Sequence, residues 1–332
     1  MYLCKVIKHL AEEIFQIKNL QDFERKALEV FRFQAENNLV YRKFIQHLGI
    51  KSAEVQTLSA IPFLPISFFK SHQILSSDAE PAIVFSSSGT TGTVNSFHPV
   101  INIDLYRQSF QQTFHKFYGD IAEYNLLALL PSYAEREGSS LIYMVDDLMS
   151  KSRPDSNYFL YNHQELADKL CQLQKEKQKV ILIGVTYALL DFIETYQFQF
   201  PELIVMETGG MKGKRKEIVR EELHEILCRG FGVPKIHSEY GMTELLSQAY
   251  SKGDGIFKCP PWMKVMIRDT NDPFQYLSAN KTGGINVIDL ANLYSCSFIA
   301  TQDLGRLHEW DRFEVLGRFD DSDIRGCNLL VQ

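Results

Sequence analysis

The sequence lacks several features that mark membrane, secreted and metal-binding proteins. No apolar run approaches the roughly 20 residues of a membrane-spanning helix, and Met1–Lys5 leads straight into an amphipathic helical pattern rather than the apolar core of a signal peptide. The six cysteines are scattered, and no two form a Cys-x-x-Cys pair. These absences disfavour a membrane span, a disulfide framework and a zinc site, and they predict a cytoplasmic protein with reduced thiols.

Two further absences concern ligands. No Gly-x-x-x-x-Gly-Lys-Ser/Thr loop occurs in the sequence, which excludes a Walker-type phosphate loop. The net charge is −6 and the pI is about 5.9, which disfavours nucleic acid and anionic membranes as partners. What is present is an ordinary globular composition, 45% hydrophobic and 23% charged, whose 23 Phe and 15 Tyr suit a large core or an apolar ligand pocket.

The chain alternates between helical and strand-like patterns. Residues up to about Leu48 are rich in Glu, Lys, Gln and Leu and predict helices, and the prolines of Ile61–Ile66 then impose extended backbone. Short apolar runs typical of buried strands follow at Ala82–Phe85, Leu126–Leu130, Val180–Val185 and Leu203–Met206. This alternation predicts an α/β fold in which helices pack on mostly parallel sheets.

Leucine spacing predicts helices between and after these strands. Apolar residues at i, i+4 and i+7 indicate one helix over 166–173, and a second periodic stretch, 219–227, should end at Gly230 or Gly232. Past Gly253 the pattern changes to strand signals separated by turns. These are Gly284–Ile288, Ser297–Ala300 and Phe313–Leu316. They predict a smaller β-rich part that closes the chain.

A dense cluster of hydroxyl and glycine residues directly follows the strand-like run that ends at Phe85. It comprises Ser86, Ser87, Ser88, Gly89, Thr90, Thr91 and Gly92. Backbone N–H and side-chain O–H groups at this density can converge on phosphate oxygens, and glycine permits a close approach. On composition alone, an ordinary Ser/Gly/Thr surface loop is the alternative.

A second segment combines four useful groups within Glu239–Glu244. They are the ring of Tyr240, the flexible Gly241, the hydroxyl of Thr243 and the carboxylate of Glu244. Such groups can stack on a base, approach a phosphate and hold Mg²⁺ through an oxygen ligand. A strand-to-loop turn with a buried tyrosine is the alternative.

A third segment, Thr301–Arg306, is followed by Phe313–Asp321. A lone carboxylate after a strand, here Asp303, can accept hydrogen bonds from both hydroxyls of a ribose, and such charge-assisted bonds contribute about 1.5–3 kcal/mol each. Two Gly-Arg turns in β-hairpins are the alternative.

In this order, the three segments resemble the signatures of the adenylate-forming superfamily of acyl-CoA synthetases, peptide-synthetase adenylation domains and luciferases. The resemblance extends from Ile61 to Gly326. It is nearest to the acyl-protein synthetase family, the long-chain-fatty-acid–luciferin-component ligases, with phenylacetate–CoA ligases as a near branch. The stretches that carry this nearer similarity are Ile61–Lys70, Leu130–Tyr133, Glu207–Gly213 and Ile324–Cys327.

The resemblance implies a role for each matching position. Residues 86–92 would hold the β- and γ-phosphates of ATP, and Tyr240 would stack on adenine. Thr243 would contact the α-phosphate, Glu244 would bind Mg²⁺, and Asp303 would bind the ribose hydroxyls.

Further positions complete this implied site. Arg318 would assist Asp303, and Gly241 belongs to the same motif as Tyr240. A loop beside adenine and the acyl group would be formed by Gly209, Gly210 and Met211.

The chain departs from the superfamily pattern in three places. Gln302 stands where a Thr-Gly-Asp motif has glycine, and Val94–Ser96 stands where a lysine often follows the phosphate loop. The sequence also stops six residues after Gly326, where the superfamily continues into a mobile lid domain with a catalytic lysine. We therefore expect a large adenylate-forming domain without the C-terminal lid domain.

The expected domain is an α/β unit of helix-flanked sheets plus a small β subdomain. Its divisions are a large domain over 1–318, with a helical part over 1–60 and a β-rich part over 253–318, and a hinge remnant and tail over 319–332. Either adenylation proceeds without the lid lysine, or a basic residue of this chain replaces it. The candidates, which are equally typical of a solvated helix start, are Lys212, Lys214, Arg215, Lys216 and Arg325.

Cys327 is the cysteine of the tail. The resemblance implies that it accepts the acyl group before a reductase partner does, and a thiol near Arg325 can have a lowered pKa. A small buried residue that ends the last strand is the alternative.

The sequence thus predicts an AMP-forming acid–thiol ligase with ATP and Mg²⁺ as cofactors. It would activate a carboxylic acid, a long-chain fatty acid by resemblance, and pass it to an acceptor protein such as an acyl reductase or carrier. The alternatives are a phenylacetate-type acyl- or aryl-CoA ligase and an inactive nucleotide-binding subunit.

Overall fold

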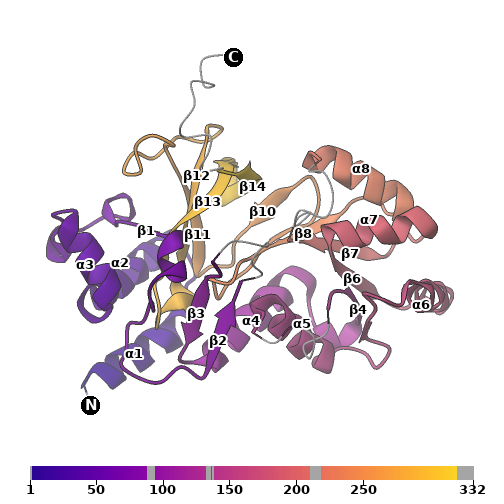
Figure 1. The fold of residues 1–332 in the computed structure, drawn as a ribbon, viewed down its shortest axis with the longest axis horizontal. Helices are drawn as coiled ribbons and strands as arrows, with labels where there is room; N and C mark the ends of the chain where they lie inside the picture. The colour runs from indigo at the N-terminus through magenta and orange to yellow at the C-terminus, as the bar shows by residue number, and fades with distance from the viewer. Residues whose placement is uncertain (1, 88–93, 132–135, 137, 210–217, 320–332) are drawn as a thin grey trace.

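Helices begin the chain, as predicted, and there are three of them in the described residues before Leu48, apart from the short 3-10 helix η1 (Ile14–Gln16). The computed structural model describes residues 2–87, 94–131, 136, 138–209 and 218–319 (Figure 1). The helices are α1 (Tyr2–Glu13), α2 (Leu20–Asn37) and α3 (Leu39–His47). The side chain of Asn19 accepts the amide of Asp22 at 2.9 Å and so caps α2, and Asn38 caps α3 in the same way.

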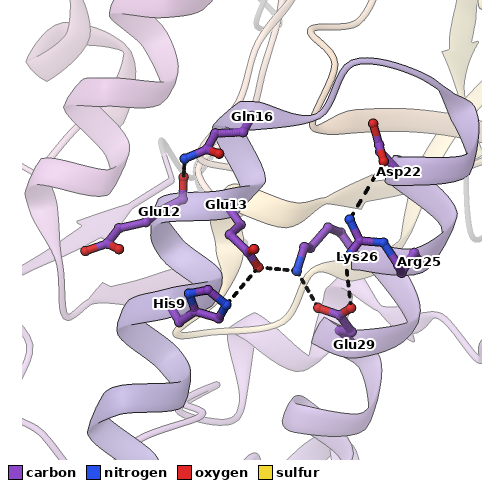
Figure 2. A network of polar contacts seen from close by, with 8 residues as sticks. All are labelled: His9, Glu12, Glu13, Gln16, Asp22, Arg25, Lys26 and Glu29. Atoms are coloured by element: carbon purple, nitrogen blue, oxygen red, sulfur yellow. Dashed lines mark hydrogen bonds and ion pairs between the residues drawn. The ribbon is translucent and has the colours of Figure 1, made fainter.

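A buried lysine fastens α1 to α2 (Figure 2). Lys26 of α2 is 4% exposed and contacts the carboxylates of Glu13, from α1, and Glu29, the latter at 2.5 Å. His9 lies 3.4 Å from the same Glu13 carboxylate. The hydrogen bond from Lys26 holds the pKa of Glu13 below its ordinary value. A buried ammonium therefore has two anionic partners, as burial of a charge requires.

One 12-stranded sheet runs through the described part of the chain. Its order is β11-β12-β13-β14-β10-β9-β8-β7-β6-β4-β5, with β1 paired to β13. The strands are β1 (Leu64–Pro65), β4 (Asn125–Leu129), β5 (Asn157–Tyr158), β6 (Val180–Val185), β7 (Ile204–Thr208), β8 (His237–Tyr240), β9 (Ala249–Ser251), β10 (Ile256–Lys258), β11 (Met263–Arg268), β12 (Thr282–Asp289), β13 (Phe298–Leu307) and β14 (Arg312–Arg318).

Half of this sheet is the predicted parallel α/β unit. Strands β5, β4, β6, β7 and β8 are parallel, and β4 and β6 are buried along their whole length. In Figure 1, α7 and α8 cover one face of these strands and α4 and α5 the other. The helices are α4 (Ile103–Tyr118), α5 (Ser140–Lys151), α6 (His163–Lys175), α7 (Thr186–Thr195) and α8 (Arg220–Phe231).

Two predicted helices and three predicted strands are confirmed here. The helix expected over 166–173 is α6, and that over 219–227 is α8. The latter ends at Gly232, whose φ of 65° is the left-handed conformation that glycine favours, whereas Gly230 lies inside the last turn. The strands β4, β6 and β7 lie where the apolar runs predicted them.

The predicted strand at Ala82–Phe85 is present as β2 (Ile83–Ser86), but the prediction that it is buried on both faces is wrong. β2 pairs with β3 (Phe97–Val100) in a separate two-stranded antiparallel sheet. Val84 is 46% exposed and Phe97 49%, so only the other face of this hairpin, with Phe85 and Val100, joins the core. A run of four apolar residues cannot distinguish a strand buried on both faces from one buried on a single face.

The predicted β-rich part exists, but it continues the main sheet. Strand β9 pairs antiparallel with β8, and β10 to β14 extend the same sheet in antiparallel pairs. The prediction of mostly parallel strands came from the alternating pattern before Gly253, and the sequence predicted no pairing direction for this half. Strand β1, within the proline-rich stretch, adds a parallel pair to β13 and so joins the N-terminal part to the antiparallel half.

Short 3-10 helices occupy several connections. They are η1 (Ile14–Gln16), η2 (Ser52–Glu54), η3 (Leu58–Ala60), η4 (Ile66–Lys70), η5 (Ile121–Glu123), η7 (Leu290–Asn292) and η8 (Glu309–Asp311). Within the described residues, no helix has both the length and the apolar character that crossing a bilayer requires.

Candidate active site

The candidate site lies where β7 and β8 end side by side. Thr208, the last residue of β7, is in register with Glu239 of β8. The predicted segments that begin at Gly209 and Tyr240 therefore leave the sheet at the same edge. Ligands of parallel α/β sheets bind beyond this edge, where the carboxyl ends of the strands meet.

Tyr240 and Asp303 meet at this edge although they belong to different predicted motifs. Both are buried, and the Tyr240 hydroxyl donates to Asp303 Oδ2 at 2.8 Å. Burial and the nearby Asp303 carboxylate raise the pKa of the tyrosine far above its ordinary value, so the hydroxyl stays protonated as a donor. The Tyr240 ring packs edge-on against Phe257 and Phe313, which holds it in place.

Arg318 completes this group from the neighbouring strand. It is opposite Asp303 in the pairing of β13 with β14, and its Nε donates to Asp303 Oδ1 at 3.1 Å. Asp303 is 7% exposed at its side chain and Arg318 77% exposed, so the pair spans the boundary between core and solvent. Arg318 and Asp303, which the resemblance assigned to one site, are therefore in direct contact.

The backbone around Asp303 is fixed by a side chain that the sequence pattern did not single out. Arg268 of β11 donates from Nη2 to the carbonyl of Thr301 at 2.6 Å and from Nη1 to Asn286 Oδ1 at 2.7 Å. The hydroxyl of Thr301 then accepts the amide of Asp303 at 3.1 Å. Gln302, the departure from Thr-Gly-Asp, lies in β13 where the register against β12 shifts, but its φ is not positive, so a side chain is tolerated at this position.

Glu244 lies close to the same group. Its side chain is buried, and burial raises its pKa, although a hydrogen bond with Ser96 and the charge of Arg318 act in the opposite direction. The carboxylate of Asp303 is near enough to raise the pKa of Glu244 as well. Glu244, Asp303 and Arg318 therefore form one electrostatic neighbourhood built from the segment after β8 and from β13 and β14.

The described ends of the predicted phosphate loop connect to this neighbourhood. Ser87 and Ser96 are joined twice, because Ser87 N donates to the carbonyl of Ser96 at 3.0 Å and Ser96 N donates to Ser87 Oγ at 2.9 Å. Ser86 N donates to the carbonyl of Gly138 at 2.8 Å. Since Ser96 also contacts Glu244, the described residues on either side of positions 88–93 are linked to the predicted metal ligand.

Two buried glutamates lie behind the site. Glu239 Oε2 accepts the hydroxyl of Thr208 at 2.6 Å, and burial raises the pKa of Glu239 to about 7, with the Glu207 charge adding to this effect. Burial alone would raise the pKa of Glu207 too, but His224 and Arg220 outweigh it and lower that pKa. A Cβ at Gly241 would lie 2.4 Å from Glu239 Oε1, so a larger residue here would have to displace that carboxylate.

Asp289 is a further buried carboxylate that sequence reasoning missed. It accepts the amides of Leu246 and Ser247 at 2.7 and 2.9 Å and the hydroxyl of Ser247 at 2.6 Å. Burial raises the pKa of Asp289 to about 6, and these bonds moderate the shift. The segment that follows Glu244 is thereby anchored to the end of β12.

Several predicted residues lie outside the described part of the chain, so their roles stay predictions. In the phosphate loop they are Ser88, Gly89, Thr90, Thr91 and Gly92; in the loop after β7 they are Gly210 and Met211; in the tail it is Cys327. The same holds for the basic candidates Lys212, Lys214, Arg215, Lys216 and Arg325.

The donor set suits Mg²⁺ held jointly with a nucleotide. Among the described residues, no group of three or more His, Cys, Asp and Glu side chains surrounds a metal position. Mg²⁺ is typically bound by one or two carboxylates together with substrate phosphates and water. Glu244 offers one such carboxylate, whose burial disfavours the charged form unless a cation is near.

These elements define the fold of the large domain of adenylate-forming enzymes. No family model matches the chain. The sequence is 24% identical over 322 residues to a long-chain-fatty-acid–luciferin-component ligase from Vibrio harveyi, covering 90% of this chain and 84% of that protein.

Solved structures share the fold at low identity. A 2-hydroxyisobutyryl-CoA ligase, solved with 2-HIB-AMP and CoA in the thioesterification state, matches with a TM-score of 0.70 at 13% identity, over 92% of this chain and 70% of its own. ATP-bound MatB from Rhodopseudomonas palustris matches with a TM-score of 0.54 at 17% identity, over 74% of this chain and 49% of its own. This chain thus spans about half the length of MatB.

These findings confirm the predicted fold class and the predicted resemblance to adenylate-forming enzymes. The prediction of an AMP-forming ligase agrees with the names of the Vibrio protein and the 2-hydroxyisobutyryl-CoA protein, both of which are ligases.

Proposed function

We propose that this chain uses ATP to activate a carboxylic acid as an acyl-adenylate, with release of pyrophosphate. The observation that carries the proposal is the hydrogen-bonded group of Tyr240, Asp303 and Arg318, with Glu244 beside it. Four residues with complementary nucleotide-binding chemistry converge from three separate segments at the edge of the sheet where such ligands bind. A set of unrelated surface turns gives no reason for this convergence.

Asp303 would bind the ribose. Each oxygen of an ionised carboxylate offers about two lone pairs, and Tyr240 and Arg318 use one lone pair on each oxygen. One acceptor position per oxygen therefore remains for the two ribose hydroxyls. Because Tyr240 and Arg318 hold the carboxylate on both sides, its orientation is set before the nucleotide arrives.

The phosphates would lie between the Ser/Gly loop and Glu244. Residues 86–92 would bind the β- and γ-phosphates, and Thr243 the α-phosphate. Mg²⁺, when bound at Glu244, would offset the negative charge that repels a carboxylate nucleophile. The substrate carboxylate oxygen then bonds to the α-phosphorus while the bond to the pyrophosphate oxygen breaks.

A long-chain fatty acid is the proposed substrate, supported by the name of the Vibrio relative. The acyl group would pass to the Cys327 thiolate, which attacks the acyl carbon so that a thioester forms and AMP leaves. From there it would pass to an acceptor protein such as an acyl reductase or carrier in the cytoplasm.

A second candidate is an acyl-CoA ligase. The fold match to a CoA ligase solved with CoA supports it. In that case coenzyme A, rather than Cys327, attacks the adenylate.

Exchange of radiolabelled pyrophosphate into ATP tests the proposal. We expect exchange that depends on an added fatty acid, and we expect Asp303→Ala to weaken ATP binding about 30- to 1000-fold, from the loss of roughly 2–4 kcal/mol. Asp168→Ala, on the exposed face of α6, is the matched control and should behave as wild type. Absence of exchange with fatty, aryl and short-chain acids alike would favour the inactive nucleotide-binding subunit.

A further inference from the structure

A fully buried histidine contacts the segment that carries Thr243 and Glu244. His98 lies on β3, just past the predicted phosphate loop, and is 0% exposed. Its Nδ1 is 2.8 Å from the carbonyl oxygen of Thr243. Phe69 packs edge-on against the ring, with centroids 5.5 Å apart, and fixes its plane.

Asn292 of η7 holds the next carbonyl. Its Nδ2 donates to the carbonyl oxygen of Glu244 at 2.6 Å, and the side chain is fully buried. The backbone carbonyl of Asn292 accepts a hydrogen bond from Gln34 Nε2, on α2, at 3.0 Å. Consecutive carbonyls of the Thr243–Glu244 segment are thus held by side chains from two different parts of the core.

The protonation state of His98 follows from these contacts. Burial lowers its pKa to about 4, so the ring is neutral at physiological pH. A carbonyl oxygen accepts only, and therefore the single ring proton must be on Nδ1. Nε2 is then a buried acceptor. It lies close enough to the Asn292 side chain for a hydrogen bond between them to raise the pKa of His98 against the effect of burial. With the ring neutral, however, Nε2 and Asn292 Oδ1 are both acceptors, and neither has another hydrogen-bond partner within the described residues.

Leaving two buried acceptors unpaired costs stability, and apolar residues of similar size would avoid that cost. Burial and packing alone therefore give no reason for a histidine and an asparagine here. What these two side chains supply is a pair of donors, each placed on one carbonyl of the segment that carries the proposed α-phosphate and Mg²⁺ groups.

We propose that His98 and Asn292 are positioning residues, which we call the carbonyl clamp, and that they fix the Thr243–Glu244 backbone in the orientation that the nucleotide requires. The inference rests on the proposed function of this site. With both carbonyls held, the peptide planes around Thr243 and Glu244 cannot rotate, so their Cα–Cβ bonds keep one direction. Asp289, bonded to the amides of Leu246 and Ser247, holds the far end of the same segment.

The two amide substitutions of His98 give a matched test. The Nδ2 of His98→Asn occupies nearly the place of Nδ1 and can donate to the Thr243 carbonyl, whereas the amide of His98→Gln reaches the place of Nε2. We expect His98→Asn to keep pyrophosphate exchange within about 3-fold of wild type, and His98→Gln to lose about 10- to 100-fold in kcat and to need more Mg²⁺. ATP affinity should change much less, because Tyr240 and Asp303 are untouched.

Equal losses in the two variants, or a loss confined to KM for ATP, would overturn the clamp. Amide hydrogen exchange over residues 241–248 tests it without catalysis. His98→Gln should speed exchange there and His98→Asn should not, while exchange in α6 stays the same in both. Unchanged amide hydrogen exchange over residues 241–248 in a folded His98→Gln protein would contradict the inference. Absence of pyrophosphate exchange in the wild-type protein would instead count against the proposed function alone.

Asn292→Leu keeps the size of the side chain and removes the donor, so it serves if His98→Gln does not fold. It should also speed amide exchange over residues 241–248. No change in that segment would reject the clamp.

Discussion

Tyr240 and Asp303, 63 residues apart in the chain, are joined by a 2.8 Å hydrogen bond between the phenol and the carboxylate. The bond links β8, at the end of the parallel half of the sheet, to β13 in the antiparallel half. It therefore connects the two halves at the edge where the proposed nucleotide site lies.

Tyr240→Phe tests this bond. The ring and its packing against Phe257 and Phe313 remain, but Asp303 loses one of the two donors that orient it. We expect ATP affinity to fall about 3- to 10-fold. This is less than the roughly 1.5–3 kcal/mol of a direct hydrogen bond to a charged group, because the lost bond orients Asp303 and does not itself bind the ribose. Calorimetric titration measures it. The control is Tyr196→Phe, at a half-buried tyrosine that caps the C-terminus of α7 and donates to Gln164 of α6. The same affinity in both variants would remove the bond from nucleotide binding.

Glu244→Gln tests the proposed metal ligand. A neutral amide binds a hard cation less well than a carboxylate does, so half-saturating Mg²⁺ in pyrophosphate exchange should rise several-fold. ATP binding should stay measurable. Exposed Glu202→Gln serves as the control, and the metal role is wrong if both variants need the same Mg²⁺ as wild type.

Glu239→Gln tests the buried carboxylate behind the site through its pH dependence. The folded-state pKa of Glu239 is about 7, above the ordinary 4.5, so between these values the folded protein binds more protons than the unfolded chain. This group's contribution to stability is therefore present at low pH and is lost as pH rises from 4.5 to 7, by up to about 1.4 kcal/mol per unit of pH. Glutamine keeps the acceptor for Thr208 but does not titrate.

Urea unfolding at pH 5, 6, 7 and 8 measures the difference between wild type and Glu239→Gln. We expect the glutamine variant to gain stability relative to wild type as pH rises. The other buried titrating groups are common to both proteins and cancel. A difference that does not change with pH would mean that Glu239 is ionised throughout.

Cys327→Ser tests the proposed acyl transfer. Serine keeps size and hydrogen bonding but has negligible alkoxide at neutral pH, so covalent labelling by radiolabelled fatty acid and ATP should disappear. Pyrophosphate exchange should persist, because adenylation precedes the attack of the thiol. The wild-type label should be released by neutral hydroxylamine, as a thioester is.

Serine substitutions at the other cysteines are the controls for this experiment and should leave labelling in place. They are Cys4, Cys171, Cys228, Cys259 and Cys296. Full labelling of the Cys327→Ser protein would contradict transfer to Cys327 and would favour the coenzyme A ligase as the function.

The sequence predicted the elements of the fold better than their arrangement. Period predicted α6 and α8 because each helix buries a regular stripe of apolar residues, and length predicted β4, β6 and β7 because each is a short continuous apolar run. The two-stranded β2–β3 sheet and the junction of β8 with β9 were missed, since strand pairing is decided between segments rather than within one.

The same limit explains what was missed in the site. Tyr240, Glu244 and Asp303 stood out because they occur in compact motifs of unusual composition. His98, Arg268, Asp289 and Asn292 are single polar residues in apolar surroundings, and their partners are far away in the sequence. The histidine inside the four-residue strand Phe97–Val100 was the one available signal, because a buried polar side chain requires a partner.

Transfer of oxygen from the acid to AMP tests the central claim most directly. A carboxylic acid labelled with ¹⁸O in its carboxylate is incubated with the protein, ATP, Mg²⁺ and a thiol acceptor, and the AMP is analysed by mass spectrometry. If the carboxylate attacks the α-phosphorus, AMP leaves with one ¹⁸O atom. AMP without the label, or ADP as the product, would contradict activation through an acyl-adenylate.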